Sequence, residues 1–162
     1  MAVPFLDKDV YGRSTLENSS FIASSKNPDK SIRGKGFVAR LSGSTIEFIS
    51  MWKLMFFGKR VFRLSGGELS FGVEPAIPAY LLKEAGGKYT VSSTLLGKTK
   101  VIYEMSDKRD YYPGNYEVTE YTLRFADGKE VTEQGAVLGK DMALSIREGK
   151  ACEIKAVLKS IS

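Results

Sequence analysis

The chain has 162 residues, of which 43% are hydrophobic and 11% aromatic, so it can build a hydrophobic core and is not wholly disordered. Its formal net charge is +5, with basic residues interspersed among acidic ones, which argues against a nucleic-acid-binding protein. Cys152 is the only cysteine and histidine is absent, which excludes an internal disulfide, a histidine or cysteine-cluster zinc site and a Ser-His-Asp triad.

Residues 1–40 show little hydrophobic periodicity and predict an irregular lead. They are rich in Ser, Asn, Asp, Lys and Gly, and Asn27-Pro28-Asp29 indicates a turn. Irregular segments of this length are usually functional or belong to a larger assembly. The N-terminal sequence lacks the pattern of a secretory signal, so we expect a cytoplasmic protein.

The next segment predicts one long apolar helix. Ser44 and Glu47 have the spacing of a capping box, and Gly58 is suited to end the helix in a left-handed conformation. Its polar residues recur every three positions, at Glu47, Ser50 and Lys53, and form one stripe about 120° wide. The other positions are apolar, so we expect the helix to need neighbours around most of its circumference. The segment is too short and too charged to span a bilayer.

After residue 58 the pattern changes to short alternating runs typical of strands. Gly66-Gly67 and Asp127-Gly128 predict hairpin turns, and residues 75–78, Pro-Ala-Ile-Pro, predict a rigid link. Residues 140–147 are compatible with a helical turn. The expected strands cover residues 60–64, 68–73, 89–96, 99–104, 116–125, 129–138 and 151–158.

The sequence therefore predicts an α+β chain in which an irregular lead and one long helix, residues 1–58, precede a C-terminal antiparallel β domain, residues 59–162, of the sandwich or jelly-roll type. Tyr89, Tyr103, Tyr116 and Tyr121 fall within strand patterns and are expected to pack in the core, whereas Tyr111-Tyr112 is expected to be an exposed pair.

The start of the predicted helix is a candidate phosphate site. A helix N-terminus presents free backbone amides and partial positive charge, and small hydroxylated residues add donors with little bulk. The simpler alternative is a plain helix cap, for which the same residues are equally suited. The candidate contacts are Ser42, Gly43, Ser44 and Thr45, with Arg33, Lys35 and Arg40 as sources of charge.

Two segments resemble the C-terminal part of the inverting glycoside phosphorylases, the group of cellobiose and chitobiose phosphorylases. Residues 42–47, Ser-Gly-Ser-Thr-Ile-Glu, stand where that family has a Thr-Gly-Ser/Thr-Ala-x-Trp segment leading into a helix. Residues 67–78 resemble the family's Gly-Leu-x-Ile/Leu-x-Pro-x-Ile-Pro pattern, with additional residues. The chain departs from the family in having Ser42 for Thr and Glu47 near the Trp position, and Tyr80 stands near a Trp that often follows Ile-Pro.

The resemblance implies that residues 1–58 end an (α/α)6-barrel-like region and that the Ser42-Gly43 pair contacts phosphate. Inorganic phosphate is the co-substrate of the family, and no other cofactor or metal is implied. The family's general acid lies upstream in the barrel, and nothing in this chain matches that segment. We therefore expect no catalytic residues here and no turnover by the chain alone. The chain has other carboxylates that could be considered for catalysis, Glu17, Asp107 and Asp110, but none has a catalytic partner at a spacing that the sequence establishes. The Asp107–Asp110 loop is expected to be exposed.

The uncovered apolar helix predicts a possible partner, which is a second copy of this chain or, as the resemblance implies, a separate catalytic barrel chain. The alternatives are a stand-alone β-sandwich that binds carbohydrate, for which aromatic side chains such as Tyr111-Tyr112 are suited, and a protein-interaction module.

Overall fold

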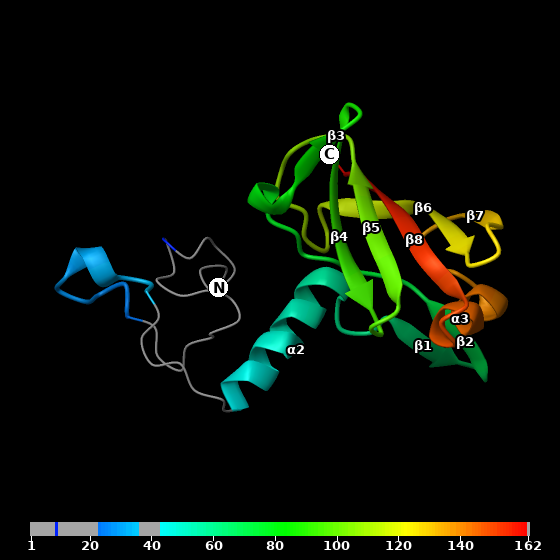
Figure 1. The fold of residues 1–162 in the computed structure, drawn as a ribbon, viewed down its shortest axis with the longest axis horizontal. Helices are drawn as coiled ribbons and strands as arrows, with labels where there is room; N and C mark the ends of the chain where they lie inside the picture. The colour runs from blue at the N-terminus through cyan, green and yellow to red at the C-terminus, as the bar shows by residue number, and fades with distance from the viewer. Residues whose placement is uncertain (1–8, 10–22, 36–42, 162) are drawn as a thin grey trace. The chain divides into compact units, whose positions relative to one another are not determined.

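The computed structural model describes Asp9 and residues 23–35 and 43–161. The chain divides into two compact units, Met1–Trp52 and Lys53–Ser162 (Figure 1). The α+β class predicted from the sequence is confirmed, with helix α2 followed by a strand-rich unit. Within the described ranges, no helix combines the length and apolar character needed to cross a bilayer.

In the first unit, residues 23–35 form a closed loop. The Ala23 amide donates to the Lys35 carbonyl at 3.0 Å, and the Gly34 amide donates to the Ala23 carbonyl at 2.9 Å. Between them lies the short helix η2 (Lys30–Ile32), whose first turn is capped by the Asp29 side chain. The Asp29 amide in turn donates to Asn27 Oδ1 at 3.0 Å, a local bond that Asn makes readily in turns, so the predicted turn is present. The rest of the predicted lead lies outside the described residues.

Helix α2 (Gly43–Phe57) starts one residue before the predicted cap, and ends as the sequence predicts. Gly58 follows it with φ = +83°, the left-handed conformation in which glycine lacks the steric penalty of other residues. The Gly58 amide donates to Leu54 O at 3.0 Å and so closes the last turn.

The remaining carbonyls at the end of α2 are all satisfied by the second unit, which contains this end of the helix. The last carbonyls of a helix have no partners inside the helix, and burying one without a hydrogen-bond donor costs free energy. The donors are Ala76 N for Met55 O at 2.7 Å, the Tyr103 hydroxyl for Phe56 O, and Glu74 N for Phe57 O at 3.1 Å. The segment that contains Pro75 and Pro78 therefore runs along the end of the helix.

Burial along α2 is uneven. Phe56 and Phe57 are buried in the last turn, whereas Ile49 is 66% exposed and Leu54 50% exposed. At about 100° per residue, Leu54 projects on the same side as the polar stripe, within about 20° of Glu47, and Ile49 projects next to that stripe. The helix therefore leaves two large apolar side chains in solvent.

The core of the second unit is a six-stranded sheet in the order β3-β4-β5-β8-β6-β7. Its strands are β3 (Lys83–Ala85), β4 (Lys88–Leu95), β5 (Thr99–Met105), β6 (Tyr116–Phe125), β7 (Glu130–Gln134) and β8 (Ala151–Ser160). Five of the seven strands expected from the pattern lie here, together with β3, a short strand that the pattern did not predict, and the other two form a separate hairpin.

One pairing corrects the prediction of a wholly antiparallel sheet. β8 lies between β5 and β6 and runs parallel to β5, so the sheet is mixed (Figure 1). Parallel neighbours need a long crossover, and here β6, β7 and α3 (Lys140–Arg147) form it. Residues 140–147 are thus helical.

The two faces of the sheet differ in burial. On one face, every second side chain of β5, β8 and β6 is buried. Tyr103, Ala156 and Tyr121 form one row across these three strands. The small side chain of Ala156 separates the two tyrosine rings. The opposite face carries partly exposed polar and charged residues, including the Lys100–Glu153 ion pair. One buried and one solvated face is the usual burial pattern of an amphipathic sheet.

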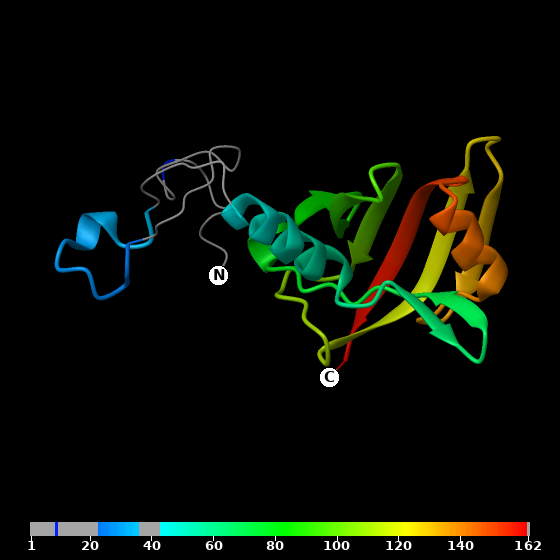
Figure 2. The ribbon, with the colours of Figure 1, turned by 90° about the horizontal axis from the view of Figure 1, so that it is seen from below.

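The buried face is covered by a second layer of mixed composition. It contains the hairpin β1 (Phe62–Ser65) and β2 (Glu68–Phe71), the segment of residues 72–78, and α3, which packs against β2 (Figure 2). Gly66 and Gly67 turn the hairpin with φ of +58° and +81°, as predicted for a two-residue turn. Phe71 connects this layer to the loop before α3 through a reciprocal backbone bridge with Leu138.

Candidate functional site

The predicted phosphate loop is described only in part. Gly43, Ser44 and Thr45 are the first residues of α2, so their backbone amides belong to a helix N-terminus. Ser42 lies outside the described residues, as do Arg40 and Glu17. Of the basic residues expected nearby, Arg33 donates from Nε to the Asn27 carbonyl at 2.7 Å, so part of its guanidinium holds the closed loop together.

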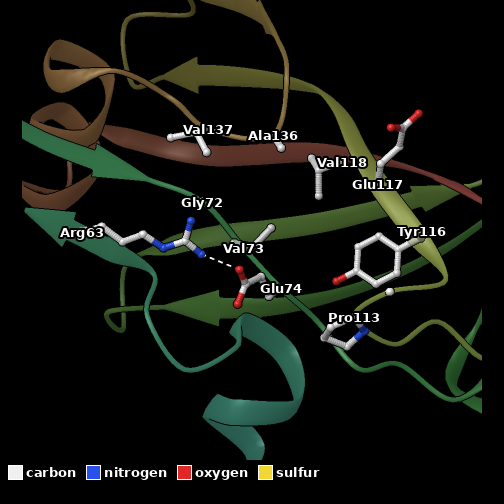
Figure 3. Close-up of a pocket in the computed structure, with 11 residues that line it drawn as sticks. Arg63, Gly72, Val73, Glu74, Pro113, Tyr116, Glu117, Val118, Ala136 and Val137 are labelled. Carbon is white, nitrogen blue, oxygen red and sulfur yellow. Dashed lines mark hydrogen bonds and ion pairs between the residues drawn. The ribbon is translucent and has the colours of Figure 1, made fainter. Parts of the chain in front are cut away.

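An open pocket of about 310 Å³ lies in the second unit (Figure 3). Three separate stretches line it: Arg63 on β1 with the segment after β2, the start of β6, and the loop before α3. Its apolar wall includes Pro113, Tyr116, Val118 and Val137, of which Val137 is 49% exposed. The pocket therefore combines an apolar wall with a small number of charged groups, the composition common in ligand sites.

The charged groups that face it are Arg63 and Glu74 (Figure 3). Arg63 donates from Nη2 to Glu74 Oε1 at 2.6 Å, and no other side-chain bond of Arg63 occurs in the described part of the chain. A guanidinium has five N–H donors and a carboxylate has two acceptor oxygens, so this single bond leaves most of both groups available. Glu117 also lies among the lining residues, but its exposed side chain projects from the face of β6 opposite to Tyr116 and Val118 and points away from the pocket (Figure 3).

Tyr116 gives the pocket wall its rigidity. Its hydroxyl donates to the Pro75 carbonyl at 2.8 Å and its ring contacts Tyr111 at 6.0 Å between centroids. Burial, with a smaller contribution from the nearby negative charge of Glu74, raises the pKa of the Tyr116 hydroxyl well above its ordinary value of 10.0, so this group stays protonated and keeps its bond. Sequence reasoning missed this pocket, because its residues are far apart along the chain and none of them forms a local motif.

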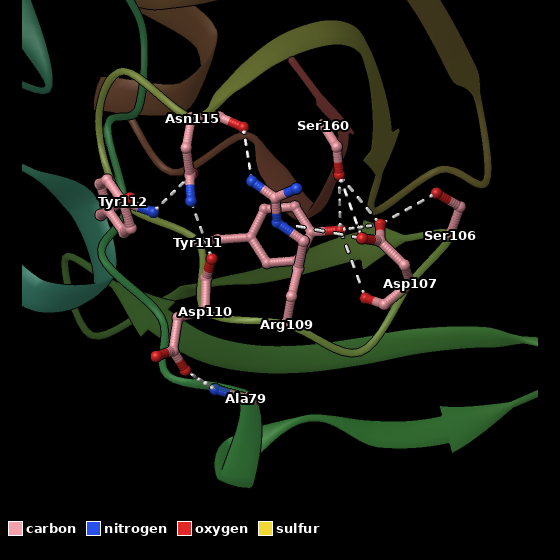
Figure 4. A network of polar contacts seen from close by, with 9 residues as sticks. All are labelled: Ala79, Ser106, Asp107, Arg109, Asp110, Tyr111, Tyr112, Asn115 and Ser160. Carbon is pink, nitrogen blue, oxygen red and sulfur yellow. Dashed lines mark hydrogen bonds and ion pairs between the residues drawn. The ribbon is translucent and has the colours of Figure 1, made fainter. Parts of the chain in front are cut away.

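A second polar cluster organises the loop between β5 and β6 (Figure 4). Asp107 accepts from the Tyr111 hydroxyl and, at 3.0 Å, from Ser160 Oγ, while Arg109 Nε lies 3.9 Å from Asp107 Oδ2. Arg109 also stacks over the Tyr111 ring, 5.7 Å from its centroid. Further along the loop, Asn115 Nδ2 donates to the Asp110 carbonyl at 2.9 Å. These bonds bind the loop to itself and to the end of β8, and they indicate a structural role.

The cluster corrects one expectation from the sequence. Tyr111 is 1% exposed, because its backbone forms a reciprocal bridge with Ile77 and its hydroxyl turns inward to Asp107. Only Tyr112, 56% exposed, fits the expected exposed pair. The prediction that Tyr103, Tyr116 and Tyr121 pack in the core is confirmed, whereas Tyr89 is half-buried. Asp107 is likewise half-buried, while Asp110 is exposed as predicted and accepts from the Ala79 amide at 2.7 Å.

We expect the Asp107→Asn variant to lose part of the acid sensitivity of the protein. The hydrogen bond from Tyr111, followed by those from Ser160 and Ser106 and the charge of Arg109, lowers the pKa of Asp107 below 3.8 in the folded state, against a partial opposing effect of burial. A lowered folded-state pKa contributes stability that is present above the unfolded pKa and is lost as pH falls through the folded one. Unfolding free energies measured by urea titration between about pH 2 and pH 6 should thus depend less steeply on pH in Asp107→Asn.

The control is Asp127→Asn, which makes the same change in net charge in the turn between β6 and β7. If Asp107→Asn and the unmodified protein show identical pH slopes, the folded Asp107 carboxylate makes no special contribution.

Among the described residues, no cluster of three or more histidine, cysteine or carboxylate side chains is arranged to hold a metal ion. A scan against protein-family models found no match to the chain, and a search of curated proteins found none either.

Proposed function

We propose that the chain is a C-terminal part or subunit of a carbohydrate-active protein of the glycoside phosphorylase type. In this role, the start of α2 contributes a phosphate-binding loop through Ser42, Gly43, Ser44 and Thr45, and residues 59–162 form a structural β domain. Catalysis would require a general acid supplied by a helical barrel, and the exposed apolar residues of α2 are suited to contact either that barrel or a second copy of the chain.

The observation that carries the proposal is the contact between the last turn of α2 and the segment that contains Pro75 and Pro78. The helix that follows the Ser42–Glu47 segment ends against the segment that contains Pro75 and Pro78, with Glu74 N bonded to Phe57 O and Ala76 N to Met55 O. The second segment of the resemblance is therefore held against the end of the helix that the first segment begins, which supports the proposal that both are parts of one family pattern.

The exposure of α2 gives further support. Ile49 and Leu54 leave large apolar surface in solvent on a helix whose C-terminal end is held in a rigid unit. A helix that packs against other helices in a larger protein would expose such side chains when those helices are absent. Single exposed apolar residues are also common on protein surfaces.

We further propose that the β domain is a reduced sandwich of the jelly-roll type, in which the β1–β2 hairpin stands for the second sheet. The hairpin and the six-stranded sheet enclose Phe71 and Tyr121, whose rings meet edge to face at 5.9 Å between centroids. This ring contact between the two layers is typical of a sandwich core.

The phosphate site is tested by titrating the isotope-labelled full chain with sodium phosphate and following the backbone amides by NMR. We expect the resonances of the Gly43, Ser44 and Thr45 amides to shift. The double variant S42A/S44A should weaken phosphate binding about fivefold, because each neutral hydrogen bond raises the affinity about severalfold. Ser50→Ala, at an exposed position of the same helix, is the matched control.

The same preparation, incubated with phosphate and β-linked disaccharides, should release no sugar 1-phosphate. Robust product would contradict the assignment of the chain as a non-catalytic part, and unchanged Gly43–Thr45 amides across the titration would remove the phosphate site.

A second candidate function is a carbohydrate-binding module. The observation that favours it is Tyr112, whose side chain is 56% exposed at the tip of a loop held in one conformation by the Asp107 and Asn115 bonds. A fixed, exposed aromatic ring offers a face on which a sugar ring can stack.

A further inference from the structure

The pocket beside Arg63 and Glu74 carries one positive and one negative side chain, already paired with each other. A negatively charged ligand would face the Glu74 carboxylate, and a positively charged ligand would face the Arg63 guanidinium. Either net charge is therefore opposed in the pocket.

A neutral ligand with many hydroxyl groups meets neither obstacle. Arg63 keeps N–H donors that are not used by Glu74, while the second oxygen of Glu74 is an acceptor. A hydroxyl group both donates and accepts, so neighbouring hydroxyls of one ring can use both kinds of group at once. The ring's C–H groups can pack against Tyr116, Pro113 and Val137.

The wall is built before any ligand arrives. The Tyr116 hydroxyl is bonded to Pro75 O, the Tyr121 hydroxyl connects Val73 N at 3.2 Å with Ala136 O at 3.2 Å, and Arg63 is paired with Glu74 (Figure 3). These bonds hold together the three stretches that line the pocket, so little ordering would be needed on binding.

We propose that this pocket is a saccharide-binding subsite, separate from the α2 N-terminus, which takes one neutral sugar residue. The choice of glucose-containing probes rests on the proposed function, whereas the ligand class follows from the charges and the wall of the pocket. Its volume of about 310 Å³ is at the lower end of the range for small-molecule sites, as a single sugar residue requires.

The experiment is an NMR titration of the labelled full chain with glucose, N-acetylglucosamine and cellobiose, each tested separately. We expect the amides of residues 72–74, 114–118 and 136–137 to shift with at least one of these sugars. Glu74→Ala should weaken that binding about tenfold, because it removes an acceptor and the partner that orients Arg63.

Glu148→Ala is the matched control, since Glu148 also forms an exposed ion pair at 2.6 Å, with Lys150, far from the pocket lining. Equal affinity of the Glu74→Ala and Glu148→Ala variants for the sugar overturns the proposal. So does the absence of shifts at the pocket with all three sugars.

Two further outcomes separate this inference from the functions proposed above. Loss of sugar binding in Tyr112→Ala but not in Glu74→Ala overturns the pocket and favours the exposed-tyrosine module. Sugar shifts at the pocket without phosphate shifts at Gly43–Thr45 support the subsite while removing the phosphate site, and the reverse result removes the subsite alone.

Discussion

Replacing Gly58 by alanine should destabilise the protein by about 3 kcal/mol, one part from the left-handed backbone and one from steric overlap. Gly58 has φ = +83°, and a Cβ there would lie 2.8 Å from Glu74 Cβ and 2.9 Å from Glu74 O. The neighbour is backbone that is itself bonded to Phe57 O, so it has little freedom to move away. The measurement is the free energy of unfolding from urea titration.

Gly128 provides a control matched in backbone conformation. Its φ is +84°, and a Cβ at that position would meet nothing within 4 Å. Gly128→Ala should thus show the conformational penalty alone, about 1 kcal/mol. Equal losses for the two variants would mean that the approach of Glu74 to the end of α2 does not constrain the structure.

Tyr121→Ala should cost about 4 kcal/mol or more, because it removes a fully buried ring from the centre of the second unit. The ring contacts Phe71 edge to face, and the hydroxyl accepts from the buried Val73 amide at 3.2 Å. Loss of the ring leaves both a cavity and an unpaired amide. The measurement is again the free energy of unfolding from urea titration. A variant that no longer shows a cooperative unfolding transition also agrees with this prediction.

Tyr121→Phe separates the two contributions. It keeps the ring and removes only the hydroxyl, so we expect a loss of about 2 kcal/mol from the unpaired Val73 amide. Tyr89→Phe is the control, since Tyr89 is half-buried and its hydroxyl has no hydrogen bond in the described part of the chain; its effect should stay within about 0.5 kcal/mol. If Tyr121→Phe behaves like Tyr89→Phe, the hydroxyl does not hold the segment of residues 72–74.

Local patterns were sufficient to find most of the elements. The end of α2 was predicted because Gly58 interrupts an apolar run, and the β1–β2 turn because two glycines separate alternating residues. β3 was missed because all three of its residues are exposed, so its sequence carries no alternation of burial. Elements whose own residues determine their conformation are thus the ones that the sequence predicts.

Properties that depend on distant residues were not predicted. Parallel pairing of β5 with β8 depends on a crossover of more than forty residues, for which no single stretch carries a signal. Tyr111 was expected to be exposed because its neighbours are charged, but its environment is set by Ile77 and Ser160, far away in the chain. The pocket beside Arg63 was missed for the same reason, since the Arg63–Glu74 pair meets Tyr116 and Val137 only in the folded unit.

The central place of β8 has a consequence for biosynthesis. This strand fills the middle of the sheet, so β5 and β6 cannot share a hydrogen-bonded sheet until residues 151–160 have emerged from the ribosome. Until then the apolar side of both strands and the edges that β8 will occupy stay open to other chains. Nascent polypeptides stalled shortly before residue 151 should accordingly recruit holding chaperones more strongly than chains released after residue 160, in which β8 can complete the sheet.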